Sequence, residues 1–308
     1  MEIRQLKTFI SIVKLGNFSQ AAQLLGYTQS TVTTHIQLLE KSLNTLLFER
    51  FGQQITLTEE GQRLYDYAKK IVRLDEDAIN ALNKAHIPNG PLIIGMSESI
   101  CAFRMPSLLK EYSVLYPDVE LKIDSYIGND FRSLLRKKIM DLAFLLEPSV
   151  ADNDLASILL WPEPIVLVAS PQHELACLEQ VTPASLNAQT LVLVESGSQY
   201  RVMLEKAMEK ANAIPKTVLD IGQLQAIKQL ILLNTGVTIL PLVAVKKELD
   251  AGELVALPWT GPKFEISTHL VYHKDRWMND AMKAFIKLVR ERLISHAGSV
   301  TNELQSTM

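Results

Sequence analysis

Residues 28–43 (TQSTVTTHIQLLEKSL) most constrain what this chain can fold into, because apolar and polar residues alternate there with the period of an α-helix. At about 100° per residue, the apolar residues fall on one side of such a helix: Val32, Ile36, Leu39 and Leu43. The opposite side carries small uncharged polar groups and one lysine: Ser30, Thr33, Thr34, Gln37 and Lys41. Its first carboxylate is Glu40, at the edge. A helix face without acidic groups suits contact with phosphates and base edges in a DNA major groove.

The composition is that of a globular protein with two or three domains. The chain has 308 residues, of which 47% are hydrophobic and 21% charged. The first residues (MEIRQLKTF) predict no secretory signal, and polar residues and Pro241 interrupt the most apolar stretch, 230–245, so no membrane span is expected. Cys101 and Cys177 lie far apart and outside any CxxC pattern. We therefore expect a cytoplasmic protein with neither a disulfide framework nor a zinc site.

The charge balance favours a nucleic-acid partner only at the amino end. The net charge of the whole chain is −3, which by itself argues against such a partner. Residues 1–58 carry five Lys and Arg residues against three Asp and Glu residues, a balance of +2 that leaves −5 for the remainder. Because this asymmetry is small, the residue pattern and not the charge carries the prediction.

The residues before 28–43 predict two further helices. Residues 4–15 have apolar side chains at helical spacing and are followed by a Gly-Asn pair that ends the helix. Ser19 is expected to cap a short second helix, and Thr28 to cap the third, with a Gly-Tyr pair as the turn between them. The arrangement predicts a helix–turn–helix, with a generic three-helix bundle as the alternative.

Residues 47–58 (LFERFGQQITLT) combine a glycine at a loop tip with an alternating β-type segment. This pattern predicts a wing, a short hairpin beside the third helix, with Arg50 placed to meet a phosphate. A long helix is then predicted from Thr58 to about His86. Its apolar stripe consists of Leu64, Ala68, Ile71, Val72, Ile79 and Leu82. The stripe predicts pairing with a second copy; packing on the chain's own domain is the alternative, and the two can coexist.

After residue 90 the pattern changes to alternating strands and helices, which predicts an α/β domain of two similar halves with a ligand site between them. The expected strands are 92–96, 120–123, 142–146, 165–169, 191–194, 237–240 and 267–272. The expected helices are 104–116, 130–138, 200–211, 222–234 and 280–294. The tail 295–308 is small and polar, and we expect it to be disordered.

The chain resembles the LysR-type transcriptional regulators along its whole length. The resemblance rests on LKTFISIVKLGNFSQAAQLLGYTQSTVTTHIQLLE and LFERFGQQITLTEEGQRL near the start. It continues in the family's order through PLIIGMSES, LYPDVELKI, MDLAFL, PIVLVASPQHELA and NTGVTILP. The resemblance implies an α/β fold overall, with a winged helix–turn–helix, a dimerising linker helix and a two-lobed effector domain like the type 2 periplasmic-binding proteins.

The implied domains are a DNA-binding domain at 1–58, a linker helix and hinge at 59–89, and an effector domain at 90–308. Within the last, lobe I covers about 90–164 and 268–294, and lobe II about 165–267. The family resemblance implies a homodimer or homotetramer on double-stranded promoter DNA, a small metabolite as effector, no cofactor, and RNA polymerase as a further candidate partner.

Transfer by position implies a set of DNA-contacting residues: Gln29, Ser30, Thr31, Thr33, Thr34, Gln37, Arg50 and Gln53. Gln29 suits a bidentate pair with adenine, and Thr methyls suit thymine methyls. The alternative for the first three residues is simple helix-start chemistry. The chain departs from the family at Thr34, where Arg is frequent, and at Gln53, where the wing often carries a basic residue. Fewer cations predict a shallower salt dependence of DNA binding.

In open α/β folds, ligands lie at the carboxyl ends of strands and the amino ends of helices. Two segments expected to be loops hold that position, and the family resemblance points to the same residues: Ser97, Glu98, Ser99, Ser196, Gly197 and Ser198. Their hydroxyls and N–H groups suit a small anion, whereas Glu98 and Glu195 would repel one unless Arg201 turns inward. A polar or cationic ligand and ordinary serine capping therefore stay open.

No residue pattern predicts catalysis. We find no nucleophile–base arrangement and no histidine cluster at metal-ligand spacing. Cys101 lies beside the first effector segment, where a packed thiol is a simpler interpretation than a redox sensor. The alternatives to a ligand-responsive transcription factor are a solute-binding protein and an enzyme of the same two-lobed fold. The first lacks an expected secretory signal, and the second lacks a catalytic constellation.

Overall fold

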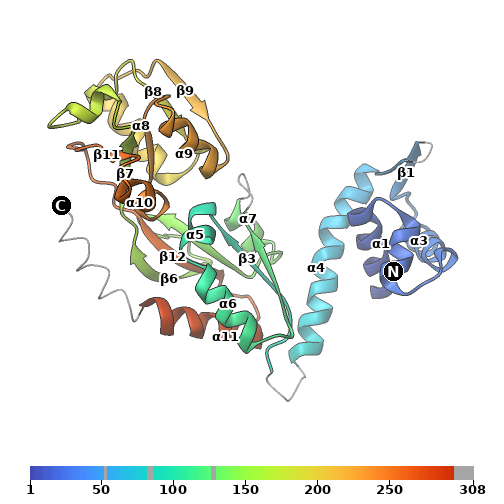
Figure 1. The fold of residues 1–308 in the computed structure, drawn as a ribbon. Coiled ribbons are helices and arrows are strands. Elements are labelled where there is room, and N and C mark those ends of the chain that lie inside the picture. Colours follow the sequence, from blue (N-terminus) through green and yellow to red (C-terminus); the bar gives the residue numbers. More distant parts are fainter. Residues whose placement is uncertain (52–53, 82–86, 126–129, 295–308) are drawn as a thin grey trace. The chain divides into compact units, whose positions relative to one another are not determined.

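The computed structural model describes residues 1–51, 54–81, 87–125 and 130–294 (Figure 1). The chain divides into two compact units: Met1–His86 with Lys137–Ile139, and Ile87–Arg136 with Met140–Met308. Four features expected from the sequence lie outside the described residues: Gln53, Leu82, the end of the long helix near His86, and the tail 295–308.

The first unit contains, in chain order, α1 (Ile3–Leu15), α2 (Phe18–Leu25), α3 (Gln29–Leu43), β1 (Phe48–Phe51), β2 (Gln54–Leu57) and α4 (Glu59–Ala81). The three predicted helices before the wing are confirmed. Gly16 and Gly26 end α1 and α2 with φ of 62° and 68°, the left-handed region that favours glycine. The expected cap of α2 at Ser19 is wrong. Asn17 stands directly before the helix, and its side-chain oxygen accepts the N–H of Ser19 at 2.8 Å.

The predicted wing is present as an antiparallel hairpin. Phe48 pairs with Leu57, and Arg50 with Ile55, in the register of β1 and β2. Thr58 joins the hairpin to α4, because its hydroxyl donates to the carbonyl of Leu46 at 2.8 Å and accepts the N–H of Gly61 at 2.9 Å. The predicted cap of the long helix at Thr58 is thereby confirmed.

One hydrophobic core holds the first unit together. It is formed by the buried residues Leu6, Phe9, Ile12, Phe18, Ala21, Ala22, Val32, Ile36, Leu39, Leu47 and Ala68. The apolar stripe of α3 therefore faces inward, as its period predicted, apart from Leu43, which is 36% exposed. Because Ala68 belongs to α4, the linker helix is part of the core of the DNA-binding unit.

The second unit contains two lobes. The first lobe has a mixed sheet in the order β4-β3-β5-β12-β6. Its strands are β3 (Gly90–Met96), β4 (Val119–Asp124), β5 (Leu142–Glu147), β6 (Leu155–Pro162) and β12 (Ser267–His273). β4 and β5 run parallel to β3, whereas β12 runs antiparallel to both β5 and β6.

Helices cover both faces of the first lobe's sheet. Phe144 of β5 packs with Tyr112 of α6 (Pro106–Leu115) and Phe285 of α11 (Asp280–Val289) on one face. On the other face, Leu145 packs with Leu135 of α7 (Phe131–Arg136). Burial on both sides explains why 142–146 is a continuous apolar run.

The helix expected at 104–116 is present as α6, two residues shorter at its start, but a separate short helix before it was not expected. The structure has α5 (Glu98–Phe103) followed by α6 (Pro106–Leu115). Pro106 occupies the first turn of α6, and since proline has no N–H to continue the hydrogen bonds of α5, one helix ends and the next begins there. Because α5 begins at Glu98, the segment 97–100 is a helix start and not the loop that we expected.

The second lobe carries two small sheets, β10-β7-β11 and β8-β9. Its strands are β7 (Ile165–Ala169), β8 (Thr190–Leu193), β9 (Thr217–Asp220), β10 (Thr238–Pro241) and β11 (Val255–Ala256). Its helices are α8 (Gln199–Lys210), α9 (Leu224–Leu232) and α10 (Leu242–Asp250). Besides α5, the sequence expectation missed β6, β9, α10 and β11. The lobes are joined where β6 leads into β7, and where Ile266 leads into β12; the N–H of Glu163 donates to Ile266 O there at 2.8 Å.

Candidate DNA-binding surface and effector site

The amino end of α3 is fixed by a cluster of hydroxyl groups. Thr28 Oγ1 accepts the N–H of Thr31 at 3.2 Å and lies 2.8 Å from the hydroxyls of Ser30 and Thr31. Ser19 Oγ donates to Gln29 Oε1 at 3.0 Å, which joins α2 to α3. The helix-start chemistry considered as an alternative is therefore present at Thr28, while Gln29 and Ser30 stay exposed beside it.

The outward face of α3 holds the remaining predicted contacts. Thr34 and Gln37 are exposed, and Thr31 and Thr33 are half-buried. The hydroxyls of Thr33 and Thr34 donate to the carbonyls of Gln29 and Ser30, each at 2.9 Å. Since each hydroxyl hydrogen is used within the helix, these two residues offer an outside partner acceptor oxygens and methyl groups.

A hollow of about 530 Å³ lies beside this face, between α3 and β1. Its walls are Phe18, Thr33, Ile36, Gln37, Glu40, Leu46, Phe48 and Glu49. Glu40 accepts the N–H of Leu47 at 2.8 Å, so this carboxylate holds the chain entering the wing. A phosphate placed in the hollow would meet Glu40 and Glu49, which makes the Ser30–Thr34 end of the face the more favourable place for a DNA backbone.

Of the two wing residues predicted to contact DNA, the structure describes only the backbone of Arg50. Arg50 lies in β1 opposite Ile55. Its side chain and all of Gln53 lie outside what the structure describes.

The predicted dimerisation stripe on α4 is largely covered by its own chain. Ala68 is fully buried in the core of the first unit, and Leu64, Ile71 and Val72 are half-buried against that core, so the alternative of packing on the chain's own domain is present at these positions. Ile79 is 61% exposed, and Leu82 is not among the described residues.

Two residues that the sequence reasoning missed, Tyr67 and Leu74, are 65% and 69% exposed and lie seven residues apart. Their spacing places them on one side of α4 with Ile71 at the margin. A heptad count along α4 would have found this second apolar row.

The first predicted effector segment is the start of α5. Ser97 precedes the helix, its hydroxyl lies 3.1 Å from that of Ser99, and Ser99 is buried. Glu98 Oε2 accepts the N–H of Leu224 at 2.8 Å, across the boundary between the lobes. The structure therefore brings Glu98 to the amino end of α9, a pairing that 126 residues of separation hide from the sequence.

The second predicted effector segment is a loop before α8. Ser196 and Gly197 are exposed, Ser198 is half-buried, and Gly197 adopts φ of +103°, a backbone region that favours glycine. Close to this loop, burial of the Tyr200 side chain raises its pKa to about 12.

Arg201, which was expected to offset the cleft carboxylates if it turned inward, is buried and already bonded. Its guanidinium donates to Val194 O, Asp220 and Glu205. It is therefore held by its own lobe.

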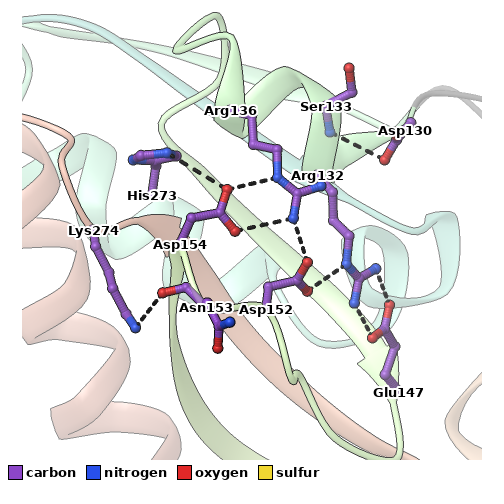
Figure 2. Close-up of polar contacts among 10 residues, drawn as sticks. All are labelled: Asp130, Arg132, Ser133, Arg136, Glu147, Asp152, Asn153, Asp154, His273 and Lys274. Atoms are coloured by element: carbon purple, nitrogen blue, oxygen red, sulfur yellow. Dashed lines mark hydrogen bonds and ion pairs between the residues drawn. The ribbon is translucent and has the colours of Figure 1, made fainter.

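A larger polar cluster lies in the first lobe, and the sequence reasoning missed it (Figure 2). Arg132 of α7 makes a bidentate pair with Glu147, at the end of β5, and donates to Asp152 at 2.9 Å. Arg136, one turn later, donates to Asp152 at 2.5 Å and to Asp154 at 2.8 Å. The i, i+4 spacing of the arginines and the Asp-Asn-Asp run were the available signals.

The electrostatics of this cluster follow from the pairing. The hydrogen bond from Arg136 lowers the pKa of Asp154 to about 2, and Arg132 likewise lowers the pKa of Asp152. His269 is buried on β12, the strand that pairs with β5, and desolvation lowers its pKa. Cys101 is half-buried, and burial together with Glu98 raises the pKa of its thiol, which disfavours the reactive thiolate.

Within the described part of the chain, no cluster of His, Cys, Asp and Glu has a metal-binding arrangement. Among the same residues, no helix has the length and apolar character needed to cross a membrane.

A winged helix–turn–helix followed by a two-lobed α/β unit defines a DNA-binding regulator with a ligand-binding domain. The family model described as "Bacterial regulatory helix-turn-helix protein, lysR family" matches residues 3–62, and that described as "LysR substrate binding domain" matches residues 85–294. The chain therefore belongs to the LysR family of transcriptional regulators, and it is not expected to be an enzyme. The predicted family, fold class and regulatory function are confirmed.

Similar proteins agree over almost the whole chain. The HTH-type transcriptional regulator YwqM of Bacillus subtilis is 36% identical over 94% of this chain and 99% of its own. GltR of the same organism is 30% identical over 94% and 97%. Full-length OxyR from Pseudomonas aeruginosa, solved as a single-residue variant, shares the fold with a TM-score of 0.71, 20% identity and coverage of 96% of both chains. CbnR complexed with its target DNA has a TM-score of 0.67 at 19% identity, covering 94% and 99%.

Proposed function

We propose that the exposed face of α3 reads a specific operator sequence, with Gln29, Ser30, Thr31, Thr33, Thr34 and Gln37 against the major groove. The observation that carries the proposal is the chemistry of this face. Gln29, Ser30, Thr34 and Gln37 are exposed and uncharged, and the core-facing stripe holds the helix rigidly from behind. Such a rigid helix, with no acidic group among these exposed residues, is complementary to DNA in shape and charge. CbnR, a relative in fold, has been solved with its target DNA.

The wing adds a second contact in this proposal. Arg50 and Gln53 approach the phosphates beside the groove that α3 occupies. The carboxylates of Glu40 and Glu49 limit how far the phosphate backbone enters the hollow between α3 and β1. In this proposal, the contacts with the DNA backbone therefore lie near Ser30 and Thr34.

The regulator acts as a homodimer or homotetramer, and the pairing surface lies on α4. The exposed side chains of Tyr67 and Leu74 support this surface, because exposed apolar groups in a row on one helix favour association. Two copies then present two recognition helices to a two-fold operator.

A small polar metabolite binds between the lobes, near Ser97–Ser99 and Ser196–Ser198, and the protein acts in the cytoplasm. The exposure of Ser196 and Gly197 in the second segment supports the site, because serine hydroxyls and backbone N–H groups suit a polar ligand. Glu98 already bonds the amino end of α9, which supports a role for this junction in sensing the ligand.

The test is footprinting of the full-length chain on the DNA upstream of its own gene and of the adjacent genes. We expect a protected region with two related half-sites, and no protection at any of these promoters would overturn the proposal. A thermal-shift screen of metabolites against the same protein then identifies the effector, since a ligand of the folded state raises its Tm.

A further inference from the structure

The short helix α5 is bound at its amino end to the other lobe. The carboxylate of Glu98 accepts the N–H of Leu224, the first residue of α9, at 2.8 Å. Gln223 precedes α9, and within the described residues its side chain makes no capping hydrogen bond. A carboxylate from the first lobe thus does for α9 what a local cap usually does for a helix.

A second contact joins the same two helices one turn further along α9. The ammonium nitrogen of Lys228 lies 5.5 Å from the centre of the Phe103 ring, at the end of α5. Lys228 is only 5% exposed and is fixed from below, because it bonds Ala244 O at 3.0 Å and Glu248 at 2.5 Å. The cation that Phe103 meets is therefore a rigid part of the second lobe.

The residue directly after α5 is bound to the connection between the lobes. Arg104 Nη2 lies 2.8 Å from Glu163 Oε1, and Trp161 Nε1 donates to the same carboxylate at 2.8 Å. Glu163 is 2% exposed and stands between β6 and β7, where the chain passes from one lobe to the other. Hence α5 contacts the second lobe and, through the residue at its carboxyl end, the connection between the lobes.

We propose that α5 is a clasp that holds the two lobes in one arrangement, with Glu98 as the residue that closes it. A local cap would stabilise the first turn of α9 in every arrangement of the lobes, whereas the N–H of Leu224 is bonded by Glu98 of the other lobe. Because the acceptor comes from the other lobe, that hydrogen bond exists only while the lobes stay together. The same separation moves Phe103 away from Lys228, so the two contacts open in one step. If the proposed effector site at Ser97–Ser99 is correct, its ligand acts directly on the clasp; the clasp itself does not depend on that site.

Hydrogen exchange of the full-length protein tests the clasp. We compare the wild type with Glu98→Ala, and with Glu179→Ala as a control that removes an exposed carboxylate from the second lobe. Loss of a charge-assisted hydrogen bond should raise the exchange rate in the first turn of α9 by about tenfold or more. The clasp further requires that α5, which belongs to the other lobe, also exchanges faster in Glu98→Ala than in the wild type. Glu179→Ala should exchange at the wild-type rate in both helices.

A second variant separates a clasp from a simple helix cap. Gln223→Asp, added to Glu98→Ala, gives α9 a local cap. The clasp predicts that this double variant regains slow exchange in α9 but keeps fast exchange in α5. Recovery of both helices, or unchanged exchange in α5 of Glu98→Ala, would overturn the proposal. If Glu98→Ala does not fold, Glu98→Gln takes its place, because it keeps an acceptor oxygen but loses the charge. We expect the same exchange pattern in Glu98→Gln with a smaller increase. No increase in α5 of Glu98→Gln would overturn the proposal equally.

Discussion

The ring of Tyr65 in α4 meets the ring of Phe9 in α1 nearly edge to face, with centroids 6.4 Å apart and planes at 77°. Phe9 is fully buried in the core that also holds Val32 and Leu39 of the recognition helix. A displacement of α4 therefore acts on the packing behind α3. If two copies pair through α4 as proposed, a change in that pairing would therefore act on the packing behind the proposed DNA-contacting face of α3.

Gly61 permits the close approach of α4 to the wing, and Gly61→Ala should destabilise the first unit. An added Cβ would overlap the carbonyl oxygen of Leu47 and press on Leu57, and neither backbone nor buried side chain can yield freely. We expect a loss of roughly 1–3 kcal/mol in the free energy of unfolding, the usual cost of overpacking. Urea denaturation measures it. Gln62→Ala, at the next and exposed position, should stay within about 0.5 kcal/mol of the wild type.

Thr34→Glu should lower operator affinity by roughly 100-fold while leaving the fold intact. The side chain of Thr34 is exposed, so a longer residue is accommodated, but its carboxylate would face phosphate oxygens. Gel shifts measure the affinity, and circular dichroism checks the fold. Thr33→Glu should act in the same direction, with added cost because Thr33 is half-buried. Gln62→Glu carries the same charge change on α4, and equal loss in that control would contradict the assignment of the α3 face.

The salt dependence of DNA binding should be shallow for this family, because position 34 is a threonine and position 53 a glutamine. Each phosphate neutralised by a cation contributes about −0.9 to the slope of log K against log salt. Thr34→Arg should therefore steepen the slope by about one unit. Affinities over a salt series give the slope, and an unchanged slope in Thr34→Arg would show that no phosphate lies within reach of position 34.

Local chemistry made most of the first unit predictable from the sequence. Thr28 and the apolar period of 28–43 located α3, because caps and helical spacing act within one or two turns. The cap at Asn17 was missed since Ser19 is an equally good capping residue two positions on, and only the backbone decides between them.

Long-range pairing limited the prediction of the second unit. β6 exists because β12, more than a hundred residues later, pairs with it, and its own sequence does not alternate clearly. The same holds for the site. Glu98 was named from its position after a strand, but its partner Leu224 depends on how two lobes meet. The burial of Ala68 could not be predicted for a similar reason, because it depends on which domain packs against the apolar stripe of α4.

Leu74→Asp should weaken self-association without unfolding the first unit. Leu74 is 69% exposed in the isolated chain, and burying a leucine at an interface contributes roughly 1.5–3 kcal/mol. We expect the dissociation constant of the dimer to rise at least about tenfold, measured by sedimentation at low concentration. Ile71→Asp should lower both association and stability, because Ile71 also packs on the core. An unchanged mass for Leu74→Asp would place the pairing surface elsewhere.

Acid should remove part of the stability of the first lobe through Asp154. Its pKa is lowered from 3.8 to about 2 by Arg136, so the unfolded chain binds the proton more readily than the folded chain. The stabilisation is present above about pH 4 and is lost as the pH falls from about 4 towards 2. Asp154→Asn should therefore be less stable than the wild type at neutral pH, and the difference should shrink across this window.

Because Asp154 and Arg136 are both exposed to solvent, the whole effect of this ion pair on stability should decrease in high salt. Thermal melts between about pH 2 and 6 measure it, with Glu179→Gln as the control. A difference between Asp154→Asn and the wild type that stays constant with pH would mean that the ion pair with Arg136 does not set the ionisation of Asp154.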